Sequence, residues 1–150
     1  MDQTATLSVP ATPAGIGQAA EALRAWSDRQ GLAVAARDRL LTVLDEVLSN
    51  IARHSLRGPT GPTGPTGQVG WIEVHVACRD GVLEARVVDQ AAPFNPLLVP
   101  PPDTSRPLCE RTPGGLGIAL VRALTDDVRY ERAGDRNHLT MTWRLGPPQA

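Results

Sequence analysis

Hydrophobic and polar residues recur along the first part of the chain in patterns that predict one strand and two helices. Residues 5–9 alternate with the period of a short strand, and a proline-containing segment ends it. A helix is predicted from about residue 17 to residue 30, where Gly31 follows as a helix-ending glycine. A longer helix is predicted over residues 34–56. The apolar residues expected to face the core are Ala20, Leu23 and Trp26 in the first helix, and Leu40, Leu44, Val47, Leu48 and Ile51 in the second.

The second half of the chain has the pattern of four strands and one short helix. The strands are predicted at residues 71–78, 82–88, 128–132 and 139–145. A turn at residues 79–81 joins the first two as a hairpin, and a turn at residues 133–137 joins the last two. The short helix at residues 117–124 lies between the two pairs. We therefore expect an α/β (α+β) two-layer sandwich, in which helices cover one face of a mixed, mostly antiparallel sheet.

Two segments lack hydrophobic periodicity. Residues 58–70 carry three tandem copies of Gly-Pro-Thr, too few for a collagen triple helix, and a flexible surface loop is expected there. Residues 90–113 are rich in proline, and loops of this length in a compact domain are usually lids or disordered, so a lid is expected. Neither segment divides the chain, and residues 1–150 are expected to form a single domain.

Composition narrows the classes of function. The formal net charge is -1 and no cationic strip interleaves with aromatic residues, so direct binding of nucleic acid is not expected. All 15 cationic residues are arginine, which excludes a P-loop lysine or a Schiff base. Cys78, Cys109 and the three histidines lack the spacing of a zinc site. No leader or membrane span is apparent, and a cytoplasmic location is expected.

The second predicted helix carries a polar stripe beside its apolar face. Glu46, Asn50, Arg53 and His54 fall within roughly a third of the helix circumference. If this stripe faces a cleft, Asn50 could supply a neutral oxygen ligand to Mg²⁺, and Glu46 could accept a proton from a hydroxyl group or water. The alternative is an ordinary solvated helix face, because polar pairs at this spacing are common.

Two further segments could contact a nucleotide. Residues 113–117 form a glycine-rich turn that opens into an apolar helix, where backbone amides and the helix dipole stabilise polyphosphate. Asp89 ends a hydrophobic strand, and its carboxylate could accept a hydrogen bond from an exocyclic amine such as that of adenine. Taken separately, the glycine segment could be a flexible linker with a glycine N-cap, and the aspartate could simply form a turn.

Together and in this order, the three segments resemble the N, G1 and G2 boxes of the Bergerat ATP-binding fold. Histidine kinases, gyrase-type enzymes and the anti-sigma-factor serine/threonine kinases share this fold, and the chain is most similar to the last family. The resemblance runs from the first strand to Leu145, including the segments at residues 129–132 and 137–140.

The resemblance implies roles for individual residues. Glu46 would be the catalytic base and Asn50 the Mg²⁺ ligand. The residues implied in ATP binding are Asn50, Asp89, Ala91, Gly114, Gly115, Leu116, Gly117 and Thr140. The implied activity is phosphorylation of a serine on a STAS-domain anti-anti-sigma protein, with partner switching between that protein and a sigma factor. A homodimer is usual in such a family.

The sequence departs from the family pattern at the G1 box. Ala91 stands where glycine is expected, and if the backbone needs a positive φ or close approach to adenine, alanine costs about 1 kcal/mol and weakens ATP binding. A non-catalytic protein-binding module of the same fold, with weak or structural ATP binding, is therefore the alternative function.

A second glycine pattern points elsewhere. Residues 15–20 satisfy Gly-x-Gly-x-x-Ala after a possible strand, as in dinucleotide-binding proteins. The acidic residue required about 20 residues later is missing, because that part of the chain has a helical pattern. A dehydrogenase would also need more βαβ units, so this reading is not favoured.

Overall fold

A computed structural model describes residues 3–57, 70–98 and 115–146 of the chain. Five strands form one sheet in the order β1-β2-β3-β5-β4, and every pair of neighbours is antiparallel. The strands are β1 (Thr4–Pro10), β2 (Trp71–Arg79), β3 (Val82–Asp89), β4 (Asp127–Ala133) and β5 (Arg136–Arg144). The helices of the described part are α1 (Pro13–Gln30), α2 (Val34–Arg57), α3 (Gly115–Leu124) and the short 3-10 helix η1 (Pro96–Leu98).

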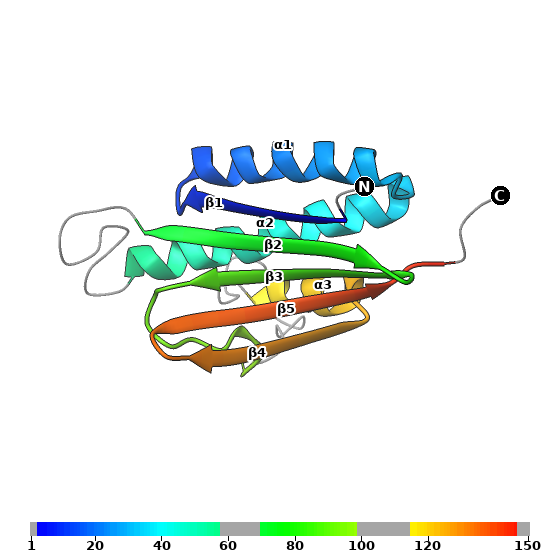
Figure 1. The fold of residues 1–150 in the computed structure, drawn as a ribbon. Helices are drawn as coiled ribbons and strands as arrows, with labels where there is room; N and C mark the ends of the chain where they lie inside the picture. Colours follow the sequence, from blue (N-terminus) through cyan, green and yellow to red (C-terminus); the bar gives the residue numbers. More distant parts are fainter. Residues whose placement is uncertain (1–2, 58–69, 99–114, 147–150) are drawn as a thin grey trace.

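This architecture confirms the predicted α/β sandwich (Figure 1). A mostly antiparallel sheet was expected, and the described strands are antiparallel throughout. The predicted Gly-Pro-Thr loop lies outside the described residues except for Gly70, and the predicted lid does so beyond residue 98. Within the described ranges, no helix is long and apolar enough to cross a membrane.

The helices pack on one face of the sheet and leave the other face open (Figure 1). Burial alternates along the strands accordingly, as expected of a sheet with one covered face. In β5, for example, the buried residues are Asn137, Leu139, Met141 and Trp143. Only every second residue of a strand therefore has a side chain that can reach the space between the sheet and the helices.

Helix α1 begins four residues earlier than predicted, at Pro13. The Thr12 side chain caps it by accepting a hydrogen bond from the Gly15 N–H at 3.1 Å. Proline suits the first helical position because the N–H that it lacks would have no partner there. Leu23 and Trp26 are buried as predicted, whereas Ala20 is exposed and Ala19 is buried in its place. The predicted end of the helix at Gly31 is confirmed, with φ of 71°.

Strand β5 also begins three residues earlier than predicted. The predicted turn at residues 133–137 is only two residues long, because Gly134 adopts φ of 60° at its first position and allows a tight hairpin. Asn137 is consequently part of the strand rather than of the turn. Its side chain is therefore buried on the face of the sheet that the helices cover.

The Gly-x-Gly-x-x-Ala segment has a structural role in the fold. A Cβ on Gly15 would overlap the carbonyl oxygen of Pro10, so glycine allows the first turn of α1 to pack on the end of β1. Gly17 has no atom within 4 Å of the corresponding position. Strand β1 pairs antiparallel with β2, which differs from the parallel βαβ unit of a dinucleotide-binding fold.

The two glycines of α1 provide a matched test of this packing. We expect Gly15→Ala to lower the free energy of unfolding by about 1–3 kcal/mol, because the added methyl group forces the helix away from Pro10. Gly17→Ala should instead raise it by up to about 1 kcal/mol, since alanine favours a helix and meets no neighbour. Urea denaturation measures both values, and equal effects would contradict the proposed contact.

Candidate functional site

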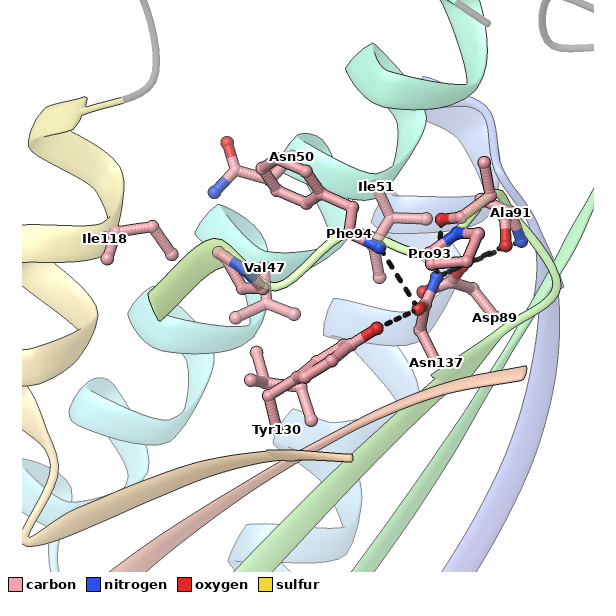
Figure 2. A pocket seen from close by; sticks show the side chains of 13 residues that line it. Val47, Asn50, Ile51, Asp89, Ala91, Pro93, Phe94, Ile118, Tyr130 and Asn137 are labelled. Carbon is pink, nitrogen blue, oxygen red and sulfur yellow. Dashed lines mark hydrogen bonds between the residues drawn. The ribbon is translucent and has the colours of Figure 1, made fainter. Parts of the chain in front are cut away.

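A cavity of about 260 Å³ lies between the helices and the sheet, close to the end of β3. Its walls come from α2, α3, β4, β5 and the segment that follows β3. Most of the lining is apolar, with Val47, Ile51, Phe94, Ile118 and Leu139 among the residues that form it. The polar lining residues are Asn50, Asp89, Tyr130 and Asn137 (Figure 2). A mostly apolar pocket with a few convergent polar groups is the usual form of a small-molecule site.

A buried carboxylate marks one end of the cavity. Asp89, the last residue of β3, is 7% exposed. Its Oδ1 accepts hydrogen bonds from the Ala91 N–H at 2.9 Å and from Asn137 Nδ2, also at 2.9 Å. No donor from the described residues reaches Oδ2. The carboxylate is thus held by one oxygen and can accept a hydrogen bond from a ligand with the other.

Helices α2 and α3 meet toward the other end of the cavity. A Cβ on Gly117 would lie 2.6 Å from Glu46 Oε2 and 3.6 Å from Asn50 Nδ2, so the backbone of α3 lies directly on the polar stripe of α2. Only glycine tolerates this approach without movement of the Glu46 side chain. The amide oxygen of Asn50 accepts a hydrogen bond from Arg53, one helical turn further on.

Alanine at position 91 does not strain the backbone. Among the described residues other than glycine, only Asp80 has a positive φ. The expected cost of a left-handed alanine is therefore absent, which corrects that part of the sequence argument. The Ala91 N–H and carbonyl oxygen are both used, because the carbonyl accepts a hydrogen bond from Arg132 Nη1 at 2.8 Å.

The structure brings together most of the predicted site residues that it describes. Asn50, Asp89 and Ala91 line the cavity, and Glu46 lies against Gly117. Gly115 and Leu116 begin α3, and Gly114 lies outside the described residues.

Thr140 does not lie with them. It lies between Arg86 and Arg129 in the strand register, on the open face of the sheet. The prediction that its hydroxyl contacts adenine is therefore wrong, because its side chain points away from the cavity.

Three residues near the cavity were missed as individual site residues: Tyr130, Arg132 and Asn137. Arg132 and Asn137 are directly paired across β4 and β5, and Asn137 is also paired with Asp89 on β3. The alternation of Leu139, Met141 and Trp143 could have revealed Asn137, because it shares their parity. The predicted turn hid that signal by ending the strand too early.

Comparison with known proteins places the chain in a family. Residues 9–143 match the family model of the histidine kinase-like ATPase domain, and the chain belongs to that family. This agrees with the resemblance between its three motif segments and the boxes of the Bergerat fold.

Individual relatives resemble the chain over most of its length. It is 27% identical to "Serine/threonine-protein kinase BtrW" of Bordetella bronchiseptica over 124 residues, which cover 76% of this chain and 80% of that protein. Its fold is similar to the crystal structure of the RsbU and RsbW domains of Rv1364c from Mycobacterium tuberculosis, with a TM-score of 0.67 and 20% identity. That match covers 97% of this chain and 33% of the solved one, so this chain spans about a third of it. The matches support the predicted kinship with the anti-sigma-factor kinase family.

The contact between α2 and α3 can be measured with a double-mutant cycle. We expect Gly117→Ala and Glu46→Ala to be coupled by at least about 0.5 kcal/mol in the free energy of unfolding, because the added methyl group meets the Glu46 carboxylate only when it is present. Asp45→Ala, on an exposed neighbouring position of α2, should combine with Gly117→Ala additively. Additivity in both cycles would contradict the close approach.

Proposed function

We propose that the protein binds Mg·ATP in this cavity and transfers the γ-phosphoryl group to a serine or threonine of a protein partner. The observation that carries the proposal is the position of Gly117 against Glu46 and Asn50, because it joins a glycine-opened helix to a carboxylate and an amide. Membership of the histidine kinase-like ATPase family and similarity to a protein named a serine/threonine kinase support it.

The adenine base would occupy the end of the cavity that Asp89 marks. Ile51, Phe94 and Leu139 offer apolar surface to an aromatic ring, and Asp89 can accept a hydrogen bond from its exocyclic amine. Ala91 lines the same region and would contact the base through its methyl group.

The phosphates would lie at the start of α3. The backbone amides at the start of α3 and the positive end of its dipole favour polyphosphate, which gives Gly115, Leu116 and Gly117 their proposed roles. Gly114, which lies outside the described residues, keeps the role that the sequence predicts for it. Mg²⁺, when bound, would neutralise charge on the phosphates and help to orient them. The Asn50 amide oxygen is a suitable neutral ligand for it, and Arg53 would have to leave that oxygen.

Glu46 is the proposed general base. Its carboxylate lies beside Gly117, close to the backbone that would hold the phosphates. There it can take the proton from the attacking hydroxyl group while the hydroxyl oxygen attacks in line with the leaving oxygen.

The partners follow from the resemblance to the anti-sigma-factor kinases. We propose a STAS-domain anti-anti-sigma protein as the phosphate acceptor, a sigma factor as the alternative partner, and a homodimer as the assembly, acting in the cytoplasm. In such a switch, phosphorylation of the STAS-domain protein would change which partner the kinase holds and so regulate transcription.

A non-catalytic module with weak nucleotide binding is the second candidate. One observation favours it: the amide oxygen of Asn50 is engaged by Arg53, so metal binding there must displace a cationic side chain. The two candidates differ in phosphoryl transfer, and both can bind a protein partner.

Nucleotide binding is tested by thermal unfolding. Mg·ATP at about 100 times its dissociation constant should stabilise the protein by about 2.7 kcal/mol. Asp89→Ala should reduce this shift because the ligand amine loses its acceptor. The matched control is Asp135→Ala in the exposed β4–β5 turn, which should preserve the shift. Absence of any shift for the unsubstituted protein at high nucleotide concentration would contradict ATP binding.

The base role is tested by phosphoryl transfer to a serine-containing STAS-domain protein, followed by mass spectrometry. Glu46→Gln should slow transfer by about 10²–10⁴-fold while the thermal shift with Mg·ATP remains. Asp45→Asn, on the exposed adjacent position, should leave both unchanged. Full transfer by Glu46→Gln would remove Glu46 from the base role. ATP binding without transfer in the unsubstituted protein would favour the non-catalytic module.

A further inference from the structure

We infer that Asn137 is a positioning residue for Asp89 and thereby sets the selectivity of the cavity for a base that carries an exocyclic amine. This inference rests on the proposed nucleotide site and deepens it. In the register of the sheet, Asn137 on β5 is paired directly with Asp89 on β3 and with Arg132 on β4. The strand pairing thus places one amide between a carboxylate and a guanidinium group.

The Asn137 side chain is buried and fully engaged. It is 6% exposed, and its Nδ2 donates to Asp89 Oδ1 at 2.9 Å and to the Ala92 carbonyl at 3.1 Å. Its Oδ1 accepts from the Tyr130 hydroxyl at 2.5 Å and from Arg132 Nη1 at 3.2 Å. Figure 2 shows Asn137 between Tyr130 and Asp89 at the floor of the cavity.

The chemistry of its neighbours fixes the orientation of this amide. Arg132 can only donate, and the Phe94 N–H, 3.4 Å from Asn137 Oδ1, can only donate as well. The oxygen of Asn137 must therefore face these two groups, and its NH₂ group must face Asp89. A rotated amide would place donors against donors on one side and an oxygen against a carboxylate on the other.

This fixed donor determines how Asp89 can meet a ligand. Asp89 Oδ1 is occupied by the Ala91 N–H and by Asn137, so Oδ2 is the oxygen that remains for a ligand donor. Two donors on one oxygen also hold the plane of the carboxylate. Without Asn137, the Ala91 N–H alone would hold Asp89, and the carboxylate could turn and lose its alignment with the amine.

Asn137 also ties the segment after β3 to the sheet, through Ala92 and Phe94. A substitution could therefore loosen that segment and weaken every ligand equally. Two ligands that differ only in the amine distinguish the anchoring of this segment from the positioning of Asp89. Loosening of the segment weakens the binding of both ligands, whereas misalignment of Asp89 weakens only the ligand that carries the amine.

The sharpest variant is Asn137→Asp, which preserves the size of the side chain and an acceptor for Tyr130 and Arg132 but replaces the donor facing Asp89 by an oxygen. We propose to measure dissociation constants by calorimetry for Mg·ATP and for the Mg complex of purine riboside triphosphate, which lacks the 6-amino group. The unsubstituted protein should prefer ATP by about tenfold or more, as expected for a hydrogen bond to a charged group. In Asn137→Asp the ratio of the two dissociation constants, that of the analogue divided by that of ATP, should fall toward one. The affinity for the analogue should change much less than the affinity for ATP.

The controls separate this inference from the proposed function. Thr142→Ala lies on the open face of the same strand and should preserve the preference for ATP. If Asn137→Asp does not fold, Tyr130→Phe decides the question, since it removes only the hydroxyl group that anchors Asn137 and should still lower the ratio about twofold or more. A ratio unchanged in these variants, or equal losses for both ligands, would overturn the positioning role while leaving the nucleotide site intact. Equal affinities in the unsubstituted protein would overturn it too, whereas binding of neither nucleotide would overturn the proposed function itself.

Discussion

Gly117 lets the backbone of α3 approach the polar stripe of α2 until it lies against Glu46 and Asn50. Any side chain at that position would meet the Glu46 carboxylate, which would have to move away from the start of α3. The proposed geometry depends on this approach, because the phosphate-facing helix end and the proposed base come from segments about 70 residues apart in sequence. The absence of a Cβ at Gly117 therefore brings the start of α3 next to the Glu46 carboxylate.

The sheet supplies the other half of the cavity through its register. Asp89, Asn137 and Arg132 occupy one row across β3, β5 and β4, so backbone hydrogen bonding alone brings a carboxylate, an amide and a guanidinium group together. Arg132 also binds the Ala91 carbonyl, which ties the segment after β3 to the hairpin of β4 and β5. The polar end of the cavity is thus stabilised by the same strands that form the core, and this favours a preformed site.

The sequence predicted the fold class and the extent of α2 to within one residue, because strong helical periodicity is a local property. It failed at two turns. Pro13 was interpreted as a break although it begins α1, and Gly134 shortened a hairpin that was predicted to be longer. The second error had a consequence for the site, because it left Asn137 in a turn. The role predicted for Thr140 came instead from the family resemblance, and the strand register places that residue on the open face.

From its residues alone, the chain specifies which segments are helical or extended, and which of them carry a carboxylate, an amide or a glycine-opened helix. These are properties of short segments, and neighbouring residues determine them. Folding added the pairings between distant segments: Gly117 with Glu46, and Asn137 with Asp89. Such pairings depend on turn length and helix phase. Because side chains alternate along a strand, a one-residue change in register turns every side chain that faced the cavity toward solvent.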